Sequence, residues 1–136
     1  MIVVDASVAV KWFYPEEREA AAQRLIEGGE RLLAPALIRI EVAAALVKKA
    51  RMGIVSAEVA SRILDMWFTA SGGQLVIVPD EQDLPSASRL ALELQHPVYD
   101  CLYLALAQRH DMPLVTADAV FARRAVARYP KVKVLT

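Results

Sequence analysis

The chain has 136 residues, enough for one domain with a proper core, which we expect to span residues 1–136. No apolar run approaches the roughly 18 residues of a membrane span, and the first residues lack the basic segment of a signal peptide. Sixteen basic residues balance sixteen acidic ones, which excludes the global signature of a strongly basic nucleic-acid-binding domain.

Two further features of the composition bear on location and assembly. The single Cys101 excludes an internal disulfide framework and is compatible with a reducing environment, so we expect a cytoplasmic protein. Hydrophobic residues make up 56% of the chain, above the usual share of about 45–50%, which hints that a partner or a second copy covers some apolar surface.

Strands and helices are predicted to alternate along the chain. Apolar runs predict five short strands, at residues 2–4, 31–34, 75–78, 114–115 and 132–134. The segments between them predict helices, at residues 7–14, 16–28, 35–51, 56–70, 81–95, 99–110 and 118–128. Pro15 is expected to end the first helix, Pro35 to begin the third, and Gly72-Gly73 to form a turn. Such alternation implies a parallel sheet with helices on both faces.

Two aspartates, Asp5 and Asp118, follow apolar strands directly and precede helices. Ligands bind beyond the carboxyl ends of parallel strands, so both acids stand where chemistry is expected. If the two strands are adjacent, about 4.8 Å apart, the two carboxylates can meet. The alternative is that each aspartate caps the helix that follows it.

Glu41 lies within Ala36–Val47, a predicted helix that is apolar nearly all round. A carboxylate on a buried helix costs several kcal/mol unless it is paired or bound to a metal. Arg39 is badly placed to pair with it, because residues two apart point to different sides of a helix. The alternative is that Glu41 occupies one solvent-facing stripe.

Asp100 lies at the front of another apolar helix, in Pro97–Leu102. It can serve as a cap or as a partner of the helix dipole, or it can join the acids at the sheet edge. Together the four acids suggest a carboxylate pocket, in which mutual repulsion favours a bound cation. Oxygen ligands select Mg²⁺ or Mn²⁺ over Zn²⁺, and such ions typically act on phosphoryl groups.

Four motifs stand in order along the chain: Val4–Ser7, Glu41–Leu46, Tyr99–Ala107 and Leu114–Asp118. In these motifs the chain resembles the PIN-domain nucleases, most closely the VapC-type toxins of toxin–antitoxin pairs. The resemblance implies a three-layer α/β/α sandwich whose mostly parallel five-stranded sheet has the order 3-2-1-4-5. It implies a Mg²⁺- or Mn²⁺-dependent endoribonuclease whose catalytic, metal-binding acids are Asp5, Glu41, Asp100 and Asp118. Ser7 and Thr116 would match the hydroxyl residues that support these acids.

The resemblance also implies partners: an RNA substrate, a second copy in a homodimer, and a VapB-like antitoxin whose tail packs over the active-site groove. Aromatic residues that suit the antitoxin tail are Trp12, Phe13, Trp67 and Phe68, although each can equally be a core residue. Basic residues that suit an RNA backbone are Lys11, Lys48, Lys49, Arg123 and Arg124, with no ranking among them.

There are departures from the family pattern. Many members have Asn where this chain has Ala44, and some carry a further Asp where it has Val120 and Phe121, which puts a second metal ion in doubt.

Other enzyme classes fit the sequence less well. It has no glycine-rich phosphate loop, and His96 and His110 follow no zinc-ligand pattern, so we expect both at the surface or at helix ends. The competing interpretation is a non-catalytic PIN-like module that binds RNA or a protein partner without cleavage.

Overall fold

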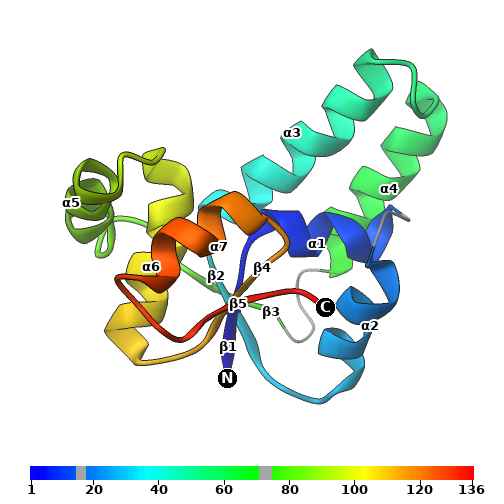
Figure 1. Ribbon diagram of the computed structural model, residues 1–136. Helices are drawn as coiled ribbons and strands as arrows, with labels where there is room; N and C mark the ends of the chain where they lie inside the picture. The colour runs from blue at the N-terminus through cyan, green and yellow to red at the C-terminus, as the bar shows by residue number, and fades with distance from the viewer. Residues whose placement is uncertain (15–17, 71–74) are drawn as a thin grey trace.

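The computed structural model describes residues 1–14, 18–70 and 75–136, and its centre is a sheet of five parallel strands (Figure 1). The strands are β1 (Ile2–Val4), β2 (Leu32–Pro35), β3 (Leu75–Val78), β4 (Leu114–Thr116) and β5 (Val132–Val134). Their order in the sheet is β3-β2-β1-β4-β5, which confirms the predicted fold class and strand order.

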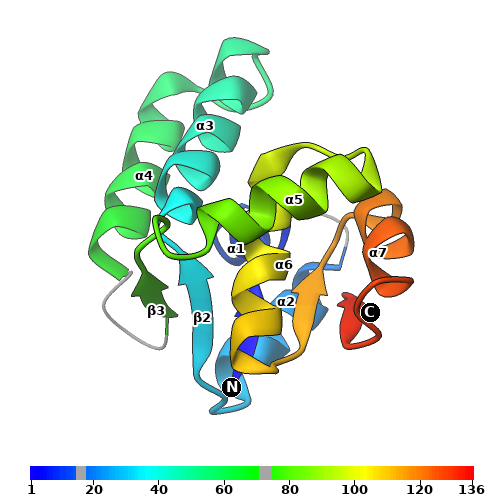
Figure 2. The same ribbon diagram turned by 90° about the vertical axis from the view of Figure 1, so that its left-hand side faces the viewer.

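Seven helices flank this sheet in the described residues. They are α1 (Ala6–Phe13), α2 (Glu19–Glu27), α3 (Leu37–Arg51), α4 (Ala57–Ala70), α5 (Leu84–Leu94), α6 (Val98–His110) and α7 (Ala119–Val126). Helix α6 packs on one face of the sheet with α5 beside it, whereas α1 and α2 lie on the opposite face (Figure 2). Helices α3 and α4 pair with each other and project beyond the sheet (Figure 1). Within the described residues, no helix combines the length and apolar character needed to cross a membrane.

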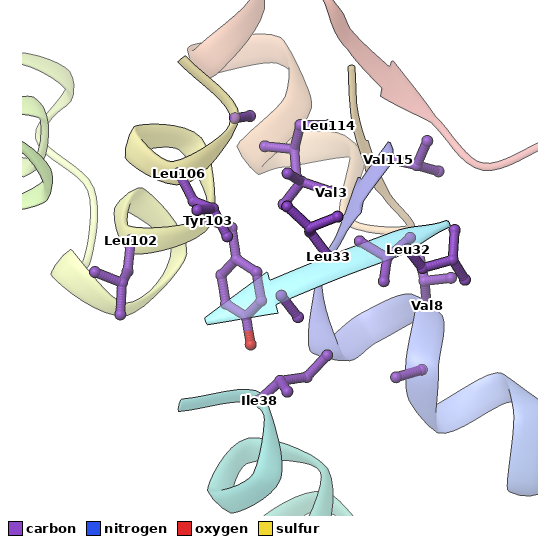
Figure 3. Packing of buried hydrophobic residues seen from close by; sticks show 14 of the residues in the cluster. Val3, Val8, Leu32, Leu33, Ile38, Leu102, Tyr103, Leu106, Leu114 and Val115 are labelled. Atoms are coloured by element: carbon purple, nitrogen blue, oxygen red, sulfur yellow. The ribbon is translucent and has the colours of Figure 1, made fainter. Parts of the chain in front are cut away.

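The central strand β1 is buried from both sides. Val3 pairs with Leu33 of β2 and with Leu114 of β4, and the side chains of Val3 and Val4 have no exposed surface. Tyr103 of α6 covers one face of this region, and Val8 of α1 covers the other (Figure 3). A continuous apolar run suits this double burial. Asp5, the residue after β1, therefore lies in the middle of the sheet, on the side formed by the carboxyl ends of the strands.

The predicted position of Pro35 is wrong. Pro35 is the last residue of β2, paired with Val78, rather than the first residue of the next helix. The neighbouring Ala36 N–H donates to the Val78 carbonyl (2.9 Å), so the nitrogen of Pro35 faces the side of β1. The pairing of β2 with β1 stops at Leu33, so no hydrogen bond to β1 is needed from the nitrogen of Pro35. The predicted helix end at Pro15 and the turn at Gly72-Gly73 lie outside the described residues.

Helix α3 is less buried than its composition suggests. Only Ile38, Val42 and Leu46 are buried, along one stripe, whereas Ile40 is 68% exposed and Val47 is 45% exposed. The expectation of a largely buried helix is therefore wrong. The reason is that α3 projects from the sheet and is packed along one side, against α1 and α4.

This burial pattern predicts a difference between two valines of the same helix. Val42→Ala should lower the free energy of unfolding by about 2 kcal/mol, because it removes two buried methyl groups and leaves a cavity. Val47→Ala should change it by no more than about 0.5 kcal/mol, because that side chain already contacts water. Urea unfolding of both variants measures the difference, and equal losses would contradict the single buried stripe.

Candidate active site

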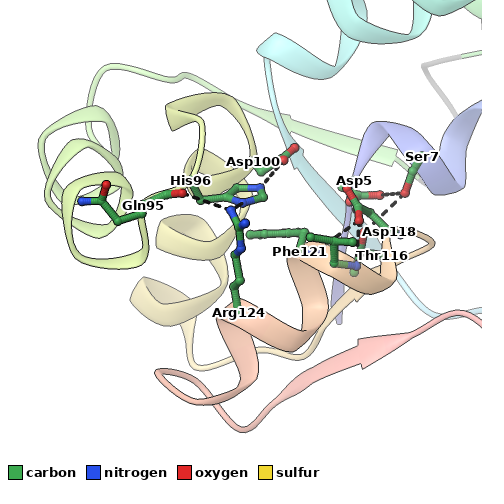
Figure 4. A network of polar contacts seen from close by, with 10 residues as sticks. Asp5, Ser7, Gln95, His96, Asp100, Thr116, Asp118, Phe121 and Arg124 are labelled. Atoms are coloured by element: carbon green, nitrogen blue, oxygen red, sulfur yellow. Dashed lines mark hydrogen bonds and ion pairs between the residues drawn. The ribbon is translucent and has the colours of Figure 1, made fainter.

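Asp5 follows β1 and lies nearly fully buried at the sheet edge (Figure 4). Its backbone N–H donates to the Val115 carbonyl of β4 (3.3 Å), which fixes its place between the two strands. Its Oδ1 accepts hydrogen bonds from the Ser7 hydroxyl (2.5 Å) and from the Val8 N–H (3.3 Å), and its Oδ2 accepts one from the Thr116 hydroxyl. Asp5 thus caps α1, and two hydroxyl groups also fix its carboxylate.

The carboxyl group of Asp5 is electrostatically unusual. Burial raises its pKa from 3.8 to about 6, and the negative charge of Asp100 contributes to the rise, whereas the hydrogen bonds from Ser7 and Thr116 oppose it. Burial is the largest cause, because removing a carboxylate from water disfavours its charged form. A cation beside this group would favour the ionised form.

Asp100 lies in the first turn of α6, half-buried. Its Oδ2 is 2.6 Å from Nε2 of His96 (Figure 4). The helix begins after Pro97, so Asp100 is not the residue that caps it. The charge of Asp100 raises the pKa of both Asp5 and Glu41. The start of α6 therefore brings Asp100 to the side of the sheet where Asp5 lies.

Glu41 reaches the same region from α3, where it lies at the border of the buried stripe. Its Oε1 accepts a hydrogen bond from the Tyr103 hydroxyl of α6 (2.6 Å). Burial, followed by the charges of Asp100 and Asp80, raises the pKa of Glu41, whereas the hydrogen bond from Tyr103 opposes the rise. The charge of Asp100 on α6 therefore acts on both other acids, Asp5 after β1 and Glu41 on α3.

Asp118 is placed differently from the other three acids. Its side chain is exposed, and its Oδ1 accepts from the N–H groups of Val120 (2.9 Å) and Phe121 (3.0 Å) at the start of α7. Its own N–H donates to the Thr116 hydroxyl (3.1 Å), the group that also contacts Asp5. The contacts of Asp118 are those of a helix cap, at the same edge of the sheet as Asp5.

The donor chemistry at this edge fits a hard divalent cation. Every acid offers oxygen ligands, and the charge of Asp100 makes ionisation of Asp5 and Glu41 less favourable, an effect that a cation would reverse. As the side chains lie, no three His, Cys, Asp or Glu residues among the described ones are close enough together to hold a metal ion. The negative charge and the oxygen atoms of these acids thus suit a cation. Their side chains, as they lie, do not form a complete set of ligands.

An open groove of about 510 Å³ lies beside the acids, between α1 and α3. Three lysines line it, Lys11, Lys48 and Lys49, and Ser7 and Asp118 border it on the side of the sheet. The apolar part of its lining comes from Val10, Ala45, Met52, Ile54 and Ala117. Positive charge beside Asp118, and beside Ser7, which contacts Asp5, suits an extended polyanion whose backbone passes these acids.

Two residues of the site escaped the sequence argument. Tyr103 is fully buried, and its hydroxyl donates to Glu41. His96 follows α5, which confirms the expected position at a helix end, and its side chain there is only 6% exposed. The spacing of His96 and Asp100, four residues apart, was the one available signal for their contact.

Comparison with known proteins is consistent with this geometry. The chain is 35% identical over 126 residues to Ribonuclease VapC3 of Pyrobaculum aerophilum, covering 90% of this chain and 93% of that protein. Its fold matches the crystal structure of PAE2754 from the same organism, with a TM-score of 0.73, 27% identity and coverage of 98% and 90% of the two chains. It also matches a toxin–antitoxin complex from Klebsiella pneumoniae, with a TM-score of 0.70, 18% identity and coverage of 98% and 96%.

The model of the PIN domain family matches residues 2–127, from the start of β1 to the end of α7. This range includes all four acids and every strand but β5. The chain therefore belongs to the PIN domain family.

Proposed function

We propose that this protein is a Mg²⁺- or Mn²⁺-dependent endoribonuclease and the toxin of a toxin–antitoxin pair. The observation that carries the proposal is the group of Asp5, Glu41 and Asp100, in which the charge of Asp100 raises the pKa of the other two acids, close to a lysine-lined groove that Ser7, the partner of Asp5, also lines. The similarity to a ribonuclease over 90% of the chain supports RNA as the substrate. The resemblance of the four sequence motifs to VapC-type toxins supports the biological role.

Each residue has a distinct part in this proposal. Asp5, Asp100, Glu41 and Asp118 would hold the ion, with Asp5 held in turn by the hydroxyls of Ser7 and Thr116. The bound ion would lower the pKa of a water molecule and offset the charge that develops on the phosphate during hydrolysis.

The groove would position the substrate. Lys11, Lys48 and Lys49 would attract the RNA backbone, so that one phosphodiester bond lies against the carboxylates.

The proposed partners are a second copy of the chain and a VapB-like antitoxin, and the proposed location is the cytoplasm, where RNA is available.

The aromatic residues differ in their availability to an antitoxin. Trp67 is buried and its Nε1 donates to the Arg39 carbonyl (3.3 Å), so it belongs to the core, whereas Phe68 is 59% exposed. Phe13 packs edge-on against Trp67 (ring centroids 5.6 Å apart), and Trp12 is half-buried, with its Nε1 donating to the Ala22 carbonyl (2.9 Å).

The nuclease proposal predicts metal-dependent cleavage of RNA. Purified protein should cut single-stranded RNA with Mg²⁺ or Mn²⁺ and lose activity with a chelator. Asp5→Asn keeps a side chain that can cap α1 but removes the charge, so the cleavage rate should fall by about 100-fold, the scale of losing one well-placed electrostatic contact. Gel electrophoresis of labelled RNA measures the rate.

Asp65→Asn is the matched control, because Asp65 is an exposed acid on α4, away from the groove lining. This variant should cut RNA at the wild-type rate. A folded wild-type protein that cuts no RNA with either ion would favour the non-catalytic PIN-like module instead.

The raised pKa of Asp5 predicts how stability depends on pH in the absence of metal. The folded-state pKa of about 6 lies above the ordinary 3.8, so between these values the folded protein holds a proton that the unfolded chain releases. The contribution of Asp5 to the free energy of unfolding therefore falls as the pH rises from about 4 to about 6, and stays low above that. The total change is about 3 kcal/mol, since one pKa unit corresponds to about 1.4 kcal/mol.

Asp5→Asn should remove this decline, so that its metal-free melting temperature exceeds that of the wild type at pH 7 but not at pH 4. Added Mg²⁺ or Mn²⁺ should raise the melting temperature of the wild type and have less effect on the variant. Calorimetry of both proteins and of Asp65→Asn measures these shifts. A variant less stable than the wild type at pH 7 without metal would contradict the electrostatic account.

A further inference from the structure

His96 occupies an unusual position for a histidine in a connection between helices. Its side chain is 6% exposed, and its ring is stacked on Phe121 of α7, with centroids 4.9 Å apart and planes at 24° (Figure 4). Both ring nitrogens have polar partners: Nε2 lies 2.6 Å from Asp100 Oδ2, and Nδ1 lies 3.1 Å from a guanidinium nitrogen of Arg124. The ring thus links α7 to the acid on α6.

The backbone explains why the imidazole points this way. Gln95 ends α5 in the left-handed conformation (φ 53°), and the N–H groups of Gln95 and His96 both donate to the Ala91 carbonyl. The chain turns sharply there, and Pro97 leads into α6. The same guanidinium nitrogen of Arg124 also donates to the Gln95 carbonyl (3.0 Å), so Arg124 is fixed against this turn as well as against the ring.

The chemistry of arginine determines the direction of these hydrogen bonds. A guanidinium group has only donors, so Nδ1 of His96 must accept from Arg124 and carries no hydrogen. The hydrogen of the neutral ring is therefore on Nε2, where it is donated to Asp100. A ring with hydrogens on both nitrogens would have no acceptor for Arg124.

We propose that Arg124 and His96 are positioning residues that hold the carboxylate of Asp100 for cation binding, through a directed chain of hydrogen bonds from Arg124 to His96 to Asp100. The proposal rests on the proposed function in one respect, the part of Asp100 in the cation site. Asp100 lies on α6, and its two supports come from the end of α5 and from α7. The position of α7 thereby affects the orientation of Asp100, which lies on another helix.

This role is separate from a contact between Arg124 and RNA. Its guanidinium already donates to a backbone carbonyl and to an imidazole, so its effect should appear in cation binding without any RNA. Partners of carboxylate or histidine ligands commonly change metal affinity by about 10- to 100-fold when removed. We expect the loss of Arg124 or His96 to weaken cation binding on the same scale.

The first experiment identifies which nitrogen of His96 carries the hydrogen. The chain has only two histidines, and His110→Gln assigns the remaining signals to His96. Long-range ¹H–¹⁵N spectra of the imidazole, recorded at mildly alkaline pH, should show the Nε2–H form in the wild type. Arg124→Ala should give a mixture of the two forms, because Nδ1 loses its fixed donor. A wild-type ring with its hydrogen on Nδ1 overturns the proposal.

The second experiment measures Mn²⁺ affinity without RNA, by electron paramagnetic resonance of the free ion. Arg124→Ala and His96→Leu should each weaken binding by about tenfold, whereas His96→Gln, whose amide offers both a donor and an acceptor, should stay within about threefold of the wild type. Arg128→Ala is the matched control: Arg128 joins the end of α7 to Glu93 of α5 (3.0 Å) at the surface, so its loss tests the docking of α7 alone.

The outcomes separate this inference from the nuclease proposal. Unchanged affinity in Arg124→Ala and His96→Leu, or an equal loss in Arg128→Ala, overturns the positioning role even if the wild type cuts RNA. The expected pattern of affinities in a protein that cuts no RNA supports the positioning role and contradicts the nuclease. A wild type that binds no Mn²⁺ overturns both.

Discussion

The structure depends on a carboxylate buried at the end of its central strand. Burial of Asp5 disfavours its charged form, and the fold offsets only part of that effect, through two hydroxyls and one backbone N–H. A helix cap does not have to be buried, since the exposed Asp118 caps α7. Under the proposed function, the burial of Asp5 prepares a site for a cation.

The elements around Asp5 follow from this constraint. Strand β4 lies beside β1 and supplies Thr116, the start of α1 supplies Ser7, and the two hydroxyls lie 3.4 Å apart. Helices α6 and α3 add their acids from two different directions, each held by a hydrogen bond, Asp100 to His96 and Glu41 to Tyr103. Among the described residues, the hydrogen-bond partners of these three acids are hydroxyls, a backbone N–H and an imidazole, with no lysine or arginine, which leaves the negative charge of the group in place.

The class of fold could be predicted from the sequence, because the alternation of strands and helices depends on short local patterns. The same local patterns singled out the four acids as candidates. The strand order came from the resemblance to a family, and the structure confirms it. The partners of the acids could not be predicted, because they come from distant positions: Tyr103 is 62 residues from Glu41, and Arg124 is 28 residues from His96. The burial of α3 was misjudged because composition does not show that a helix projects from its sheet.

The projection of α3 has a consequence for Glu41. The other two acids follow the central strand or begin a helix packed on the sheet, whereas Glu41 stands on a helix attached along one stripe. Rotation of α3 about its own axis would move this acid while the sheet stays in place. With side chains about 5 Å from the axis, a roll of about 20° moves a carboxylate by about 2 Å. The hydroxyl of Tyr103 opposes that roll, so a residue of α6 sets the angle at which α3 presents its acid.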